Sequence, residues 1–180
     1  MANMGIGRLG DPSVIIKQKY RWTLSWSGPF GQIPSHFVKV AARPRRETDE
    51  VELGFLNGTT WIPGKSKWVP LSVTYYDVAD ASMQSLYDWI ATIQDFQDPA
   101  TLKASEKRGW DGTGILTHYD GTGKEIEIWE LYSAWPKEVD FGGLDTQDSD
   151  VATIDITFRY SEAKQFGLCG PTATGIQLGC

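Results

Sequence analysis

The sequence predicts a mainly β protein, an antiparallel β-sandwich or half-barrel with one α-helix. Several segments alternate apolar and polar residues at the period of two that a half-buried strand requires. Only residues 81–96 repeat apolar residues at helical spacing, and Asp-Gly-Thr-Gly runs mark tight turns. At 180 residues we expect one domain over 14–162, a flexible arm over 1–13, and a Gly-rich, Cys-containing extension over 163–180.

Three strands are predicted before the helix, each by the apolar face that it presents. The first strand spans residues 14–26, with one face formed by Ile16, Tyr20, Trp22, Leu24 and Trp26. The second spans residues 35–42, with a face formed by Val38, Val40 and Ala42. The third spans residues 67–77, with a face formed by Val69, Leu71, Val73 and Tyr75.

Residues 43–67, between the second and third strands, combine dense charge with turn signals. Arg43-Pro44-Arg45-Arg46 runs directly into an acidic stretch, and Asn57-Gly58 and Pro63-Gly64 are turn dipeptides. We expect a long, partly ordered hairpin or loop. A loop longer than about 12–15 residues in a compact domain is usually functional or an interaction arm.

The helix and the strands that follow it are predicted by a change of period. Asp80 is placed to cap the helix, and Asp98-Pro99 ends it. The apolar face of the helix consists of Met83, Leu86, Ile90 and Ile93. Strands over 114–119 and 124–132 flank the turn at 120–123, with a bulge expected at Trp129-Glu130. A final strand over 151–160 points inward with Ile154, Ile156, Phe158 and Tyr160.

The charges divide the chain into a basic and an acidic part. Residues 1–46 hold eight Lys or Arg and one acid, whereas the remainder holds nine Lys or Arg and 22 acids. The net charge of −6 argues against a general nucleic-acid binder, because phosphate affinity requires cations. The division favours either a basic arm for an acidic partner or unlike faces on identical copies that stack head to tail.

Catalysis and membrane insertion find no support in the sequence. His36 and His118 form no metal-binding spacing, so no metal or cofactor is expected. Pairs among Glu125, Glu127, Glu130 and Asp155 would suit a glycosidase, but alternating acids on a strand usually form a solvated face. No apolar run is long enough for a membrane helix, and the N-terminus lacks the core of a signal peptide. Synthesis in a cytoplasm is expected.

The tryptophans and the charged segment supply candidate contact residues. Trp22 and Trp89 lie on apolar faces and are expected in the core. Trp61, Trp68 and Trp110 lie near turns and favour subunit contacts, although a Trp-rich carbohydrate-binding module is an alternative. The charged candidates for contact with a neighbouring copy are Arg43, Arg45, Arg46, Glu50 and Glu52. A solvated loop or nucleic-acid contact are the other interpretations of the basic run.

Both cysteines, Cys169 and Cys180, lie in the Gly-rich C-terminal segment. Their separation permits a loop within one chain, and exposed thiols on a flexible segment equally permit bonds between copies. We favour the interchain disulfide.

The second half of the chain resembles a known family. Asp120-Gly-Thr-Gly-Lys-Glu-Ile-Glu-Ile-Trp-Glu-Leu-Tyr-Ser-Ala-Trp-Pro-Lys-Glu-Val leads into Asp140-Phe-Gly-Gly-Leu-Asp, and Ala152-Thr-Ile-Asp-Ile-Thr-Phe-Arg-Tyr closes the domain. This pattern, most specific over 131–160, resembles the tail tube proteins of contractile-tailed bacteriophages. The tubes of type VI secretion and of phage-like bacteriocins are similar. The resemblance covers about residues 14–162.

The resemblance implies a structural, non-enzymatic subunit. Six subunits would close a ring, and rings would stack into a hollow tube in the virion tail. Genomic DNA would pass through the bore without specific binding. Implied partners are further copies of the chain, the tail sheath, the baseplate hub, the tape-measure protein and the tail terminator. If the hairpin over 114–132 lines the bore, Glu125 and Glu127 are candidates for its lumen.

Overall fold

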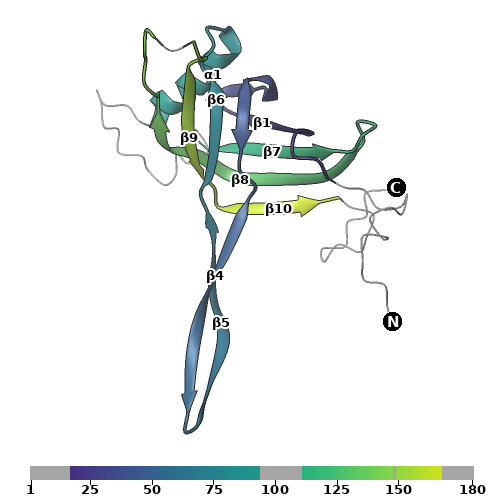
Figure 1. Ribbon diagram of the computed structural model, residues 1–180, viewed down its shortest axis with the longest axis vertical. Helices are drawn as coiled ribbons and strands as arrows, with labels where there is room; N and C mark the ends of the chain where they lie inside the picture. Colours follow the sequence, from purple (N-terminus) through teal and green to yellow (C-terminus); the bar gives the residue numbers. More distant parts are fainter. Residues whose placement is uncertain (1–16, 94–110, 148, 168–180) are drawn as a thin grey trace.

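The computed structural model describes residues 17–93, 111–147 and 149–167. These residues form ten strands, one α-helix and one 3-10 helix (Figure 1). Every strand pair is antiparallel, and the main sheet does not close into a barrel. The mainly β class with one helix is therefore confirmed. Within the described ranges, no helix has the length and apolar character needed to cross a membrane.

The main sheet is continuous but bent, because one long strand belongs to both of its halves. Its order is β2 (Gly31–Ile33), β1 (Trp22–Gly28), β7 (Gly112–Tyr119), β8 (Glu125–Asp140), β9 (Thr153–Arg159), β6 (Leu71–Tyr76) and β3 (Val38–Ala41), while β10 (Glu162–Phe166) pairs with β8 off this path. The first part of β8 pairs with β7 and β10, and the part from Trp135 onward pairs with β9. Ser133, between these parts, has a positive φ of 50°. In Figure 1, β7, β8 and β10 run across the view, whereas β6 and β9 stand upright.

The core lies inside this bend and is centred on aromatic rings. Trp26 stacks on Phe158 with 4.3 Å between ring centroids, and its Nε1 donates a hydrogen bond of 2.7 Å to the hydroxyl of Tyr75. Gly114 of β7 makes room for this ring, since a Cβ there would lie 2.5 Å from Cζ3 of Trp26. Trp89 also joins the cluster, 5.6 Å from Trp26, so the expected core position of Trp89 is confirmed.

Helix α1 (Ala81–Ile93) closes one end of the core and has the apolar face that the sequence predicts, while the predicted residues 94–96 lie outside the described part of the chain. Met83, Leu86 and Ile90 are buried with Trp89, and Ile93 is partly buried against them. Asp80 caps the helix through a 3.0 Å hydrogen bond from the backbone N–H of Ser82.

The predicted strand faces are partly right. Leu71, Val73 and Tyr75 of β6 are buried, as are Ile154, Ile156 and Phe158 along β9, with Tyr160 just beyond it. In the first strand, Leu24 and Trp26 are buried and Trp22 is half-buried against the core. That strand begins at Trp22 rather than at residue 14, and Tyr20 is 71 % exposed, so its inward assignment is wrong.

The second predicted strand differs most from the structure. Ser35–Phe37 form a 3-10 helix, η2, and β3 begins only at Val38. The register shifts between Val38 and Val40, which breaks the alternation and leaves Val40 55 % exposed. Phe37, which the period-two pattern placed on the opposite face, is the buried residue.

The segment predicted as a partly ordered hairpin or loop is a hairpin, which is ordered and projects from the body (Figure 1). It consists of β4 (Arg45–Phe55) and β5 (Gly58–Val69), joined by two residues beside the expected Asn57-Gly58 turn. Pro63-Gly64 is not a turn but lies within β5, near a register shift between Thr48 and Glu50. The hairpin, hereafter the arm, extends the ladder of β3 and β6. Pro44 and Pro70, which lack an N–H, stand where that ladder is interrupted.

Strand β10 was not predicted from the sequence. It crosses the expected boundary at 162/163 and pairs with β8 from Glu162↔Tyr132 to Phe166↔Ile128. Its pattern contains one buried apolar residue, Ala163, which gives too weak an alternation to be recognised.

Candidate assembly surfaces

The outer part of the arm carries two unlike faces. Cross-strand pairing places Glu52 opposite Trp61 and Glu50 opposite Pro63 on one side. We call Glu50, Glu52 and Trp61 the carboxylate face. The other side, the aliphatic face, consists of Val51, Leu53 and Ile62. Trp61 is 56 % exposed, and the three aliphatic residues are 40–45 % exposed. Contiguous exposed apolar side chains of this kind mark contact surfaces.

The base of the arm is instead basic and is engaged with its own chain. Arg45 pairs with Glu47 at 2.6 Å, and the guanidinium of Arg46 lies 5.8 Å from the ring centroid of Trp68. Trp68 also contacts Tyr160, with 5.9 Å between ring centroids. These predicted interface residues therefore make contacts within the subunit, and exposed pairs such as Arg45–Glu47 contribute little to stability.

Glu127 is the buried charge that holds the arm's attachment point. Its side chain is 4 % exposed, and its carboxylate accepts hydrogen bonds from three other segments of the chain and from Trp129 in its own strand. These donors are Lys17, Arg43 at 3.0 Å, Trp129 at 2.5 Å and Gln165 at 3.3 Å. Burial alone would raise the pKa of Glu127, but the hydrogen bonds from Lys17 and Trp129 and the charges of Lys17 and Arg43 outweigh it, so its pKa lies below its usual value.

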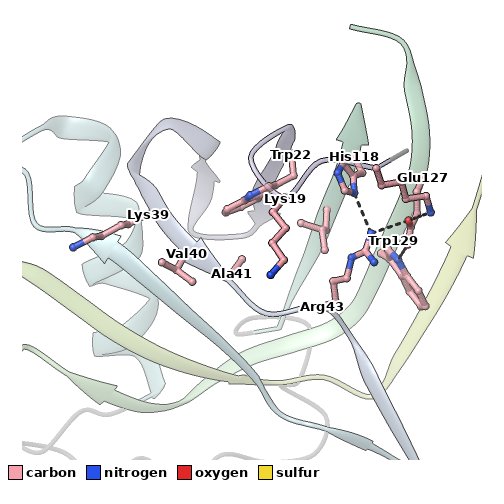
Figure 2. Close-up of a pocket in the computed structure, with 11 residues that line it drawn as sticks. Lys19, Trp22, Lys39, Val40, Ala41, Arg43, His118, Glu127 and Trp129 are labelled. Carbon is pink, nitrogen blue, oxygen red and sulfur yellow. Dashed lines mark hydrogen bonds and ion pairs between the residues drawn. The ribbon is translucent and has the colours of Figure 1, made fainter. Parts of the chain in front are cut away.

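His118 holds Arg43 from the other side (Figure 2). The Nδ1 atom of the imidazole lies 3.0 Å from Nη2 of Arg43, and Nε2 lies 2.6 Å from the carbonyl oxygen of Gln18. The carbonyl oxygen of Gln18 can only accept a hydrogen bond, so Nε2 of His118 carries the proton and donates it. The guanidinium of Arg43 can only donate, so Nδ1 of His118 accepts. Arg43 directly precedes Pro44 and the arm, so β7 and β8 together fix where the arm leaves the body.

A groove beside this network is basic and partly apolar. It has a volume of about 590 Å³, and Figure 2 shows Lys19, Lys39, Trp22 and Val40 along it. Lys19 and Lys39 are exposed, and within the described part of the chain neither forms an ion pair with a carboxylate. The ammonium of Lys39 lies 5.7 Å from the ring centroid of Tyr76. We call these four residues the basic groove.

The end of the molecule that bears α1 has the opposite charge. Residues 77–93 and 138–155 contain no Lys or Arg. The two segments meet where Tyr87 stacks on Phe141, with 6.3 Å between ring centroids, and where Asp77 donates a backbone hydrogen bond of 2.9 Å to Ala152. We call this surface the acidic end, and its exposed acids include Asp77, Asp80, Asp88, Asp140 and Asp145.

The two lumen candidates occupy different environments. Glu125 is exposed, whereas Glu127 is 3 % exposed and bound within the subunit. A register shift between His118 and Tyr119 separates them, because Tyr119 pairs with Glu125 and His118 pairs with Glu127. The expected bulge at Trp129-Glu130 is wrong, since both residues pair regularly with β7. The second shift in this ladder lies between Gly112 and Gly114.

Trp110, Cys169 and Cys180 lie outside the described residues. Among the described tryptophans, Trp61 is the one with a largely exposed ring. These residues therefore present no platform of several exposed tryptophans. Sequence analysis does not single out Lys19, Lys39 or His118 as contact residues. For the two lysines, the excess of cations in residues 1–46 is the sequence feature that points to this region.

The comparisons with known proteins agree with this geometry. Residues 42–164 match the model of the family described as T4-like virus tail tube protein gp19, a span that includes the arm and Glu127. The chain belongs to this family. It is therefore a structural tail tube protein, a component of the tail of a virion or of a related contractile assembly.

Solved structures share the fold at low sequence identity. A chain of the anti-feeding prophage tube-terminating cap is similar at a TM-score of 0.67 and 17 % identity, over 93 % of this chain and 100 % of that chain. The sheath/tube terminator of the PVC extracellular contractile injection system is similar at a TM-score of 0.67 and 16 % identity, over 86 % of this chain and 99 % of that chain. The SPP1 tail tube is similar at a TM-score of 0.52 and 14 % identity, over 85 % of this chain and 80 % of that chain. No curated protein matches the sequence.

Proposed function

We propose that this chain is the repeating subunit of a contractile tail tube, assembled as stacked rings of six subunits whose bore passes DNA during ejection. The observation that carries the proposal is the projecting arm, which exposes two contact faces far from the core of a tail tube fold. The same interface repeated along an axis produces a filament when it does not close on itself. Glu125, which is exposed beside the β7–β8 turn, is the proposed lumen residue, because an acidic bore repels DNA.

The partners follow from the same proposal. Similar structures come from a baseplate, a tube-terminating cap and a sheath–tube complex. We therefore propose that copies of the chain contact a sheath on the outside of the tube, a baseplate hub and a terminator at its ends, and a tape-measure protein inside. We also propose that Cys169 and Cys180 join neighbouring copies, and non-reducing gels of assembled particles would then show multimers that collapse with reductant.

Electron microscopy of the purified protein tests the central proposal. We expect rings and hollow tubes with sixfold end views at high protein concentration. Dispersed monomers under every concentration and salt condition would contradict it.

A further inference from the structure

We propose that the carboxylate face of the arm docks in the basic groove of another copy of this chain. Glu50 and Glu52 would meet Lys19 and Lys39, and Trp61 would pack against Trp22 and Val40 of that copy. The inference rests on the proposed self-assembly and names the surface that receives the arm.

The charges that remain unpaired in one subunit complement each other. Among the described residues, Glu50 and Glu52 form no ion pair, and neither do Lys19 and Lys39. Several neighbouring charges already have partners, since Asp49 lies 3.7 Å from Lys67, and Lys17 and Arg43 bind Glu127. Opposite potentials across a contact set its register and speed association.

The apolar parts of the two surfaces also match. Trp61 is 56 % exposed on the arm, and Val40 is 55 % exposed in the groove beside half-buried Trp22. A large aromatic side chain set among charges is a typical anchor of a protein interface. Burying Trp61 would remove its ring from water and would exclude water from the surrounding ion pairs.

The arm cannot reach the groove of its own subunit. The groove includes Val40, Ala41 and Arg43, which lead directly into the base of the arm. At about 3.3 Å per residue, Glu52 lies roughly 23 Å along β4 from Arg45. The arm points away from the body in Figure 1, and Arg43 is fixed by Glu127 and His118. The carboxylate face therefore needs the groove of a second copy.

The acidic end is excluded as the receiving surface by its charge. It carries Asp77, Asp80 and Asp88 with no Lys or Arg in residues 77–93, so it would repel Glu50 and Glu52. The arm and the groove are also different surfaces, so a contact between them is heterologous and can repeat from copy to copy.

Charge reversal tests the docking directly in the full chain carrying Cys169→Ser and Cys180→Ser. One variant adds Glu50→Lys and Glu52→Lys, a second adds Lys19→Glu and Lys39→Glu, and a third combines all four. We expect each double reversal to lower the sedimentable fraction at least about tenfold and the combination to restore it. A matched control, Asp88→Lys with Glu138→Lys, should assemble like the parent.

The outcomes separate this inference from the proposed function. If the parent forms tubes but the reversals have no effect, the combination does not rescue assembly, or the control fails equally, the docking is overturned and the tube function stands. If the chain with its natural cysteines never forms rings or tubes, the proposed function fails, and the docking that rests on it fails as well.

Crosslinking supplies a second measurement that does not require charge-reversed variants to fold. In the same cysteine-free chain, Lys39→Cys with Glu52→Cys should give an interchain ladder with a short thiol crosslinker in assembled material. Leu144→Cys with Glu52→Cys, which places one thiol on a 93 % exposed site at the acidic end, should not. Equal ladders from both pairs, or none from the first, would overturn the docking.

Discussion

A single buried carboxylate, Glu127, connects segments that are far apart in the sequence. It binds Lys17 before β1, Arg43 before the arm and Gln165 in β10. The sequence shows the cations and the acid but not which pairs meet, because the pairing depends on the register of β7 with β8. Simple alternation puts Glu125 and Glu127 on the same face, and the register shift between His118 and Tyr119 separates their environments.

Replacing Glu127 by Gln should lower the free energy of unfolding at pH 7 by about 1–3 kcal/mol, because hydrogen bonds to a charged group are weakened while Lys17 and Arg43 retain access to water. The pKa of Glu127 is lowered on folding, so its contribution is complete above its unfolded value of about 4.3 and is lost as pH falls through the lower folded value. Urea unfolding from pH 7 to pH 3 measures both effects. A difference between parent and variant that stays constant over this range would contradict the assignment.

At the scale of elements, long periodic segments were predictable and irregular ones were not. Helix α1, β6 and β9 bury one regular face, so their periods identify them. β3 and β8 contain register shifts, and β8 changes partners near Ser133, which a two-residue period cannot reveal. The arm has charged and apolar residues exposed on both faces, so burial leaves no pattern in its sequence.

Gly114→Ala should destabilise the subunit by about 1–3 kcal/mol, because its Cβ would lie 2.5 Å from the Trp26 ring in a packed core. Gly54→Ala, in the arm, is the matched control, since no atom lies within 4 Å of its Cβ position. Thermal or urea unfolding compares the two variants. An equal effect of both substitutions would show that the fit of Gly114 against Trp26 is unimportant.

The arm should exchange its backbone amide hydrogens quickly in the free subunit and slowly in tubes. A two-stranded ribbon outside a core is only marginally stable, and neither face of the outer part of the arm is covered within the subunit. Hydrogen exchange read by mass spectrometry should show at least about tenfold stronger protection of residues 45–69 after assembly. Residues 71–76 of β6 serve as the internal control, and arm protection unchanged by assembly would argue against its use as a contact.

At the scale of the whole molecule, the basic and acidic parts of the sequence form separate surfaces. The basic groove and the acidic end are distinct surfaces, and the outer part of the arm carries further acids. The sequence alone suggested complementary faces but could not place them. The structure shows that each surface combines charge with exposed apolar side chains, such as Val40 in the groove and Leu144 at the acidic end.

Tube assembly should weaken at high salt, because the screening length falls from about 8 Å at 0.15 M to about 3 Å at 1 M. We expect a smaller sedimentable fraction in 1 M NaCl than in 0.15 M NaCl at equal protein concentration. Sucrose of equal osmolality controls for water activity. Assembly that is unchanged or stronger in 1 M NaCl would indicate that apolar contacts alone hold the copies together.

The direct passage from the arm into the main sheet determines how the subunit would bear a load. β5 leads through Pro70 into β6, which lies between β9 and β3. Hydrogen bonds between antiparallel strands are perpendicular to the chain. Tension on the arm would therefore shear the six paired positions of β6 and β9 together instead of peeling them apart one at a time. A filament held together by such arms would therefore resist sudden pulling along them.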